Sequence, residues 1–167
     1  TNGAGFNNEA WKFVADDGPT GNWVKINDFP GPARGVGVGC SNGDHFYFGT
    51  GYRTFIENDW WEYFPATDSW IQRKNMPDTG RENAVALSVN NRIFVATGRH
   101  FGGNLTGGHL KSDVLEYDIA NNVWYERGNM PASGRESAIS FTIGGKGYIG
   151  FGENDSKVLN DFWCFEP

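Results

Sequence analysis

The stretch RENAVALSVNNRIFVATG, residues 81–98, decides the fold, because it is one of three copies that align without a gap. The other two copies are RGVGVGCSNGDHFYFGTG (34–51) and RESAISFTIGGKGYIGFG (135–152). In each copy, 17 positions separate the leading arginine from the closing glycine. Small and large apolar residues alternate in the first half of residues 81–98, and a turn and a second apolar run follow. Each copy therefore predicts two antiparallel β-strands.

A larger repeat surrounds each of these hairpins. A tryptophan precedes each copy, and Trp23, Trp70 and Trp124 recur at intervals of 47 and 54 residues. A third strand follows each copy, as DWWEYFP (59–65), DVLEYDI (113–119) and DFWCFEP (161–167), and EAWKFVA (9–15) is a further copy of it. A period of about 50 residues indicates an array of supersecondary units. In the middle unit we expect four strands, at about 83–89, 93–97, 114–118 and 123–127.

Four short antiparallel strands in each unit predict an all-β chain made of propeller blades. The pattern resembles the kelch repeat, with glycines after the second strand, an aromatic third strand, a tryptophan opening the fourth strand, and Met-Pro before the arginine. The resemblance covers nearly the whole chain and is to divergent, bacterial-type kelch repeats. It implies a β-propeller built of four-stranded antiparallel kelch blades. Kelch blades usually carry adjacent glycines, whereas this chain has GTG (49–51), ATG (96–98) and GFG (150–152).

The repeat divides the chain into four parts. They are a partial blade holding strands three and four with its connection (1–33), two complete blades (34–80 and 81–134), and a blade without its fourth strand (135–167). This is about three blades, whereas closed propellers have roughly 4–8. An unclosed array exposes apolar faces and strand edges. We therefore expect a piece of a larger ring, which further blades from the same chain or from other chains would complete.

Composition limits the classes of function. The 167 residues include 24 glycines, 13 phenylalanines and 7 tryptophans, which fits short strands joined by tight turns. The net charge of −6 argues against nucleic acid as a partner, because phosphate binding needs a positive surface. No apolar run approaches the ~20 residues of a membrane span. Cys40 and Cys164 form no disulfide framework, and we expect both to be small buried apolar residues. The resemblance, and not the composition, implies an extracellular, cell-surface or cell-envelope location.

The stretch RHFGGNLTGGHLKS (99–112) connects strands two and three of the middle blade, and its glycines raise the question of a phosphate-binding loop. A P-loop needs a lysine directly after the second glycine, and then a helix. Here His109 and Leu110 separate Gly108 from Lys111, and a strand follows. We therefore expect a flexible, glycine-rich surface loop.

Two other interpretations of the same loop concern a metal and a glycan. His100 and His109 could bind zinc only if further ligands, such as Glu153 or Asp155, converged on them. We predict neither a metal site nor a cofactor. The sequence Asn104-Leu105-Thr106 is an N-glycosylation sequon, which matters only in a secretory pathway that modifies such sites.

The loops 52–58, 99–112 and 153–160 should emerge on one rim of the propeller, together with the connections between blades. The resemblance implies that partners bind on this face. Aromatic residues and arginines are favoured interface anchors, and they also stack on sugar rings or pair with carboxylates. The candidate ligand-binding residues of the rim are Tyr52, Arg53, Phe55, Arg99, His100, Phe101, His109, Lys111 and Lys157.

Other repeated residues are expected to have structural roles. We expect Trp23, Trp70 and Trp124 to pack between blades. We expect a backbone conformation that strains residues other than glycine at Gly51, Gly98 and Gly152. Arg34, Arg81 and Arg135 each open an innermost strand near the channel. Their recurrence predicts a hydrogen bond or ion pair, with Glu62 or Glu116 as candidate partners. The alternative is a ring of cations that faces a ligand in the channel.

These observations favour a non-enzymatic interaction module that binds a protein or a glycan through its rim loops. One alternative, which the resemblance implies, is a fragment of a kelch-like sugar-modifying enzyme or oxidase. The tyrosine, cysteine and histidine pattern of a copper radical site is not recognisable, and no catalytic residue is predicted. Another alternative is a structural spacer or assembly block.

Overall fold

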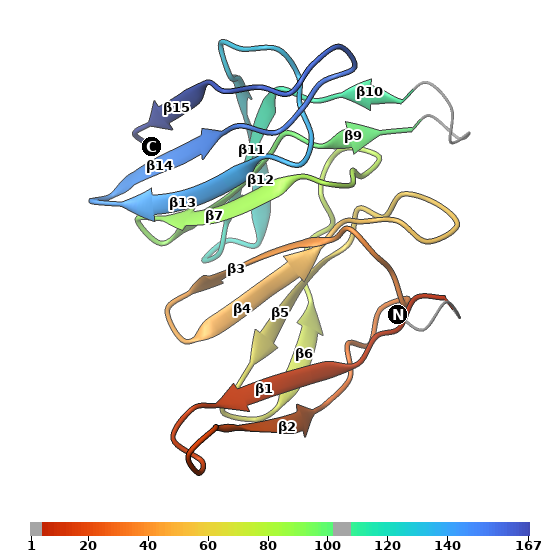
Figure 1. Ribbon diagram of the computed structural model, residues 1–167, viewed down its shortest axis with the longest axis vertical. Helices are drawn as coiled ribbons and strands as arrows, with labels where there is room; N and C mark the ends of the chain where they lie inside the picture. Colours follow the sequence, from red (N-terminus) through yellow and green to blue (C-terminus); the bar gives the residue numbers. More distant parts are fainter. Residues whose placement is uncertain (1–4, 102–107) are drawn as a thin grey trace.

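The computed structural model describes residues 5–101 and 108–167, which form β-strands joined by turns and loops (Figure 1). These two described segments contain fifteen strands in five antiparallel sheets. The strands are β1 Ala10–Val14, β2 Asn22–Ile26, β3 Val38–Asn42, β4 His45–Gly49, β5 Trp60–Phe64, β6 Ser69–Gln72, β7 Val85–Val89, β8 Arg92–Ala96, β9 Arg99–His100, β10 His109–Leu110, β11 Asp113–Asp118, β12 Val123–Asn129, β13 Ile139–Ile143, β14 Lys146–Gly150 and β15 Phe162–Phe165.

Two of the sheets are complete four-stranded blades. Their strand orders are β3-β4-β5-β6 and β7-β8-β11-β12, so the strands of each blade follow one another in chain order, with β9 and β10 lying between β8 and β11. β13-β14-β15 form a three-stranded sheet, and β1-β2 form a two-stranded sheet. The predicted all-β class with four-stranded antiparallel sheets is confirmed. Within the described residues, the structure adds one small element to the prediction, the ribbon of β9 and β10 in the long loop.

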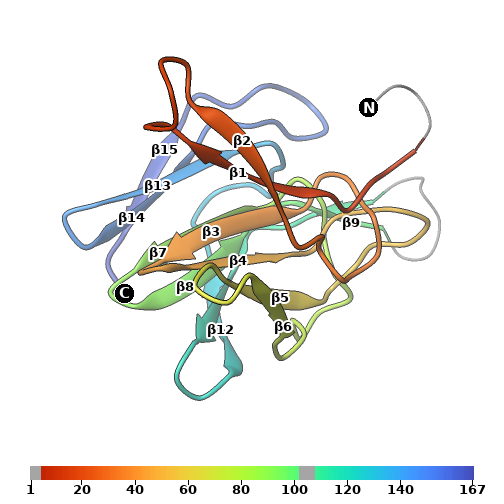
Figure 2. The same ribbon diagram turned by 90° about the horizontal axis from the view of Figure 1, so that it is seen from below.

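The first strands of successive blades, β3, β7 and β13, lie next to one another, and the sheets fan out from them (Figures 1 and 2). Equivalent residues just before these strands are linked by backbone hydrogen bonds. The amide of Asn83 donates to the carbonyl of Val36 over 3.2 Å, and the amide of Ser137 donates to the carbonyl of Asn83 over 3.0 Å. All three residues have positive φ, at 51°, 51° and 55°. The same strained turn therefore carries the contact from one blade to the next.

The turn after the second strand explains the unusual glycine pattern. Two consecutive residues there have positive φ in all three repeats, namely Thr50-Gly51 (60° and 93°), Thr97-Gly98 (61° and 91°) and Phe151-Gly152 (58° and 81°). Two adjacent glycines would adopt this backbone without strain. The chain keeps the turn geometry with one glycine, and the amides of Gly51 and Gly98 donate to the carbonyls of Arg81 and Arg135 in the next blade.

The hydrophobic core lies between blades. One cluster joins the first complete blade to the second, and contains Tyr47, Trp60, Met76, Ile93, Val95, Leu115 and Tyr117. A second cluster joins the second blade to the three-stranded sheet, and contains Val85, Leu87, Val89, Phe94, Ala96 and Ile149. Apolar burial on folding therefore depends on contact between neighbouring blades, as expected for a repeat array.

The two outer sheets differ from this pattern. Trp23 in β2 is 62% exposed, whereas the equivalent Trp70 and Trp124 are half-buried. The described residues contain no blade on that side of β2, so the packing of Trp23 between blades stays a prediction. Cys164 in β15 is exposed as well, and the prediction that it is buried is wrong. The described residues contain no helix long and apolar enough to cross a membrane.

Candidate ligand-binding rim

Each of the three repeated arginines is buried against an aspartate of its own blade. Arg135 donates to both carboxylate oxygens of Asp161, over 2.6 and 2.7 Å, and one of its nitrogens also donates to the carbonyl of Phe151 over 3.1 Å. The equivalent pairs are Arg34 with Asp59 and Arg81 with Asp113. Such a two-pronged pair fixes the direction of both side chains. The arginine therefore ties the start of the first strand to the end of the second and the start of the third.

The predicted partners of these arginines, Glu62 and Glu116, are engaged elsewhere. Glu62 accepts hydrogen bonds from Tyr47 over 2.6 Å and from Arg73 over 2.6 Å, and Glu116 accepts one from Arg127 over 2.7 Å. Both glutamates are nearly fully buried. The prediction of these two partners is wrong, because the aspartate at the start of the third strand lies closer to the arginine.

The alternative role for Arg34, Arg81 and Arg135, a ring of cations facing a channel, also fails within the described residues. Their side chains are 0–1% exposed, and each guanidinium is paired with a carboxylate. Arg135 in turn holds the pKa of Asp161 well below its usual range, chiefly through their hydrogen bonds. These three arginines therefore stabilise their blades and are not free to contact a ligand.

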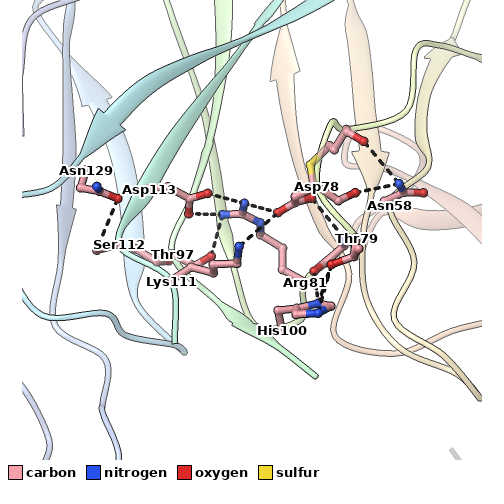
Figure 3. Close-up of polar contacts among 12 residues, drawn as sticks. Asn58, Asp78, Thr79, Arg81, Thr97, His100, Lys111, Ser112, Asp113 and Asn129 are labelled. Atoms are coloured by element: carbon pink, nitrogen blue, oxygen red, sulfur yellow. Dashed lines mark hydrogen bonds and ion pairs between the residues drawn. The ribbon is translucent and has the colours of Figure 1, made fainter. Parts of the chain in front are cut away.

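The middle blade adds a second aspartate to its arginine (Figure 3). Arg81 donates to Asp78 as well as to Asp113, and Nζ of Lys111 lies 3.9 Å from the carboxylate of Asp78. Glycine and alanine, Gly31 and Ala132, stand at the position of Asp78 in the neighbouring repeats. This charged group is therefore a feature of one blade and not of the repeat.

His100 lies at the edge of the same group (Figure 3). Its ring nitrogens lie 3.0 and 3.1 Å from the hydroxyl of Thr79, and Nδ1 lies 3.0 Å from the carbonyl of Gly80. His109 is its cross-strand neighbour in the β9-β10 ribbon. Within residues 5–101 and 108–167, no three histidine, cysteine, aspartate or glutamate side chains are grouped so that they could hold a metal ion.

A second charged group lies at the start of the inner strands, and we call it the inner-strand cluster: Glu82, Asn83, Arg99, Glu136 and Asp155. Nε of Arg99 donates to Glu136 over 2.8 Å, and Nη2 donates to Asp155 over 2.6 Å. Asn83 donates to the other oxygen of Glu136 over 3.2 Å. The cluster thus spans the junction between the second and third blades.

The cluster has an excess of negative charge, because it contains three carboxyl groups and one guanidinium, and the carboxylates of Glu136 and Asp155 contact that guanidinium. Burial raises the pKa of Glu82, and the nearby carboxylate of Glu136 raises it further, while Arg99 acts in the opposite direction. Backbone hydrogen bonds of 2.9 Å in each direction hold Glu82 against Arg99. Glu82 is therefore a half-buried carboxyl group with a raised pKa, and Arg99, whose guanidinium is held by Glu136 and Asp155, is its neighbour.

The remaining rim candidates are dispersed. Phe101 lies beside Arg99, with 5.9 Å between the guanidinium and the ring centroid. Tyr52 packs edge-on against Phe6 at 6.1 Å. Arg53 pairs with Glu57 over 2.8 Å. Phe55 is 67% exposed, and His109 and Lys157 are also exposed.

The nine candidates therefore fall into groups. Arg99 belongs to the inner-strand cluster and Phe101 lies beside it, while His100 and Lys111 lie in the group around Asp78.

The sequence predicted none of the carboxylates of the inner-strand cluster as a catalytic or rim ligand-binding residue. A signal was present, since Glu82 and Glu136 directly follow the repeated arginine in two of the three copies. Gly35 interrupts that series, and the third acid, Asp155, comes from a loop. The glycosylation sequon at 104–106 lies outside the described residues.

Comparison with known proteins places this geometry in context. No family model matches the chain. Over 176 residues the chain is 23% identical to N-acetylneuraminate epimerase of Haemophilus influenzae strain 86-028NP and, equally, to that of strain PittEE. These alignments cover 85% of this chain and 44% of each relative, so the chain spans less than half the length of the curated relatives it matches.

A solved structure described as "Structure of YjhT" superimposes with a TM-score of 0.74 at 18% sequence identity. The match covers 88% of this chain and 53% of that one. The fold is that of a kelch-like β-propeller. The four sheets formed by β1–β8 and β11–β15 are complete and partial blades of this propeller.

Proposed function

We propose that this chain is part of a β-propeller that binds carbohydrate on its rim, with the inner-strand cluster as the polar contact surface. The observation that carries the proposal is the contact of Arg99 with Glu136 and Asp155, beside Glu82, which pairs with Arg99 through the backbone. Carboxylates accept, and a guanidinium donates, the directional hydrogen bonds that sugar hydroxyl groups need. The aromatic ring of Phe101 beside Arg99 offers an apolar face for a sugar ring.

The relatives support the same class of ligand. Both curated relatives are named as enzymes that act on N-acetylneuraminate, a sugar. The fold match adds the propeller scaffold but carries no information on the ligand, because its sequence identity is 18%. A sugar ligand also fits the extracellular or cell-envelope location and the kelch-repeat membership that we propose for the chain.

Glu82 favours a second candidate function, a sugar-modifying enzyme. A general acid or base works best when its pKa lies near the working pH, and burial together with Glu136 raises the pKa of Glu82 in that direction. Epimerisation at a sugar carbon needs proton transfer, so Glu82 would be the proton-transferring group in such an enzyme. The distinguishing observation is turnover: an enzyme converts the sugar, whereas a binding module releases it unchanged.

The test is saturation-transfer NMR of the full chain with a panel of neutral, amino and acidic monosaccharides, followed over time for conversion. We expect at least one sugar to bind, and Glu136→Gln to weaken its binding by about tenfold, the effect of losing one charge-assisted hydrogen bond. Glu57→Gln on the same rim is the matched control and should bind as the wild type does. Binding that is equal in both variants, or absent for every sugar, would contradict the proposal.

A further inference from the structure

Arg99 carries the guanidinium of the inner-strand cluster, and the protein already engages all three nitrogen atoms of that group. Nε donates to Glu136 over 2.8 Å, Nη2 donates to Asp155 over 2.6 Å, and Nη1 donates to the carbonyl of Gly108 over 3.1 Å. The side chain of Arg99 is only 15% exposed. A carboxylate on a ligand would have to displace one of these partners, so Arg99 is poorly placed to bind an anion.

The other arginines in the described part of the rim are engaged in the same way. The three repeated arginines are buried in two-pronged pairs with aspartates of their own blades. Arg53 pairs with Glu57 over 2.8 Å. Among the described residues, the rim therefore offers no unpaired guanidinium for the two-pronged recognition of a ligand carboxylate.

The carboxylates of the cluster, by contrast, keep positions that can accept hydrogen bonds. A carboxylate has about four lone-pair sites. Glu136 accepts one hydrogen bond on each oxygen, from Arg99 and from Asn83, and one oxygen of Asp155 accepts another from Arg99. Glu82 adds a third carboxyl group. A ligand that supplies N–H and O–H donors therefore suits this surface better than one that supplies acceptors.

Electrostatic repulsion within the cluster also favours a cation. Burial raises the pKa of Glu82, and the carboxylate of Glu136 raises it further, because two like charges lie close together. Arg99 acts in the opposite direction but does not cancel these two effects. On the neighbouring loop, Glu153 and Lys157 are both exposed and add one charge of each sign. An ammonium group at the cluster would relieve the repulsion, whereas a further carboxylate would increase it.

We propose that the inner-strand cluster selects a sugar that carries a free amino group and binds it as the ammonium cation. The inference rests on the proposed carbohydrate site and names the class of its ligand. The ammonium group donates charge-assisted hydrogen bonds to Glu82 and Glu136, and ring hydroxyl groups donate to Asp155. A sugar acid is excluded, because its carboxylate would meet three carboxyl groups and an arginine that is already paired.

The test compares three sugars that share one kind of ring and differ in charge. Glucosamine is a cation, N-acetylglucosamine is neutral, and glucuronate is an anion. Acetylation keeps the ring and its hydroxyl groups but removes the positive charge and two of the three N–H donors. The dissociation constant of each sugar for the full chain is measured by titration calorimetry at about pH 7, where most of the amine is still protonated.

We expect glucosamine to bind at least about tenfold more tightly than N-acetylglucosamine, and glucuronate to bind more weakly than either. Glu82→Gln should reduce this ratio, because it removes one negative charge and keeps the shape of the side chain. Glu57→Gln removes one negative charge elsewhere on the rim, so it is the matched control and should keep the full ratio. A change in the fold alone would weaken both sugars equally and leave the ratio as it is.

Three results would overturn the inference. If glucosamine binds no more tightly than N-acetylglucosamine or glucuronate, the charge selection is wrong, while the proposed carbohydrate site stands. If Glu82→Gln keeps the full ratio, or Glu57→Gln reduces it equally, the preference comes from the general negative field of the protein and not from the cluster. If none of the three sugars binds, the inference fails, and the proposed function fails with it when no other sugar binds either.

Discussion

At the scale of single residues, Arg81 has two carboxylate partners, Asp78 and Asp113, and a fully buried side chain. Removing one member of a buried ion pair leaves the opposite charge without compensation. We expect Arg81→Met to lower the free energy of unfolding by about 3–5 kcal/mol in urea denaturation.

Arg53→Met is the matched control, since Arg53 makes an exposed pair with Glu57. Surface pairs of this kind contribute about 0–1 kcal/mol. Similar losses in the two variants would show that the buried arginine pairs do not support the blade.

Gly98 tests the turn that follows the second strand. Its φ is 91°, and a Cβ atom would lie 2.7 Å from the carbonyl oxygen of Glu82. Gly128 has a similar φ of 85° but no atom within 4 Å of such a Cβ. Gly98→Ala should therefore lose more stability than Gly128→Ala, which carries only the backbone strain of about 1–2 kcal/mol. Thermal unfolding of both variants measures the difference, and equal losses would argue against the close blade contact.

The pair of Asp161 and Arg135 predicts a loss of stability in acid. Arg135 lowers the pKa of Asp161 in the folded protein, so the pair stabilises the fold fully above the unfolded pKa of about 3.9. That stability is lost as the pH falls from there toward the folded pKa. Unfolding curves between pH 6 and 2 should show a steeper decline for the wild type than for Asp161→Asn. Parallel declines would contradict the pairing.

At the scale of elements, the repeat made the strands predictable. The expected strand at 83–89 is β7 at Val85–Val89, and the expected strand at 123–127 is β12 at Val123–Asn129. Alternating apolar residues and the turn signals between them are local, so the sequence alone carries them. The β9-β10 ribbon escaped prediction because each of its strands has two residues, too few for any periodic signal.

The partners of the charged residues could not be predicted from spacing. The arginine and its aspartate are 25, 32 and 26 residues apart in the three repeats, because the intervening loops differ in length. The inner-strand cluster joins Arg99 to residues 37 and 56 positions away in the next blade. The contacts of the inner-strand cluster depend on how one blade is rotated against the next, which no local pattern encodes.

The fourth-strand tryptophans give a prediction at the same scale. Trp124→Ala should destabilise the chain by about 3–5 kcal/mol, because Trp124 packs with Trp60 and Tyr117 between blades. Trp23→Ala should lower the free energy of unfolding by less than about 1 kcal/mol, because the side chain of Trp23 is 62% exposed. Urea unfolding of both variants makes the comparison. Equal losses would mean that blade contacts do not hold the array together.

At the scale of the whole molecule, stability and ligand binding depend on the same junctions. The core clusters lie between blades, and the inner-strand cluster crosses from the second blade to the third. Apolar side chains are exposed on both outer sheets, among them Trp11 and Phe13 at one end and Phe141 and Ile143 at the other. Exposed faces of this kind mark interaction surfaces. We infer that neighbouring blades or strands cover them and complete the rim.

The most direct test of the central claim is the affinity of the full chain for the best-binding sugar, measured for the wild type, Glu136→Gln and the rim control Glu57→Gln. The account predicts that Glu136→Gln binds about tenfold more weakly while the control binds as the wild type does. Equal affinity in all three proteins, or no binding of any sugar by the wild type, would contradict a carbohydrate site at the inner-strand cluster.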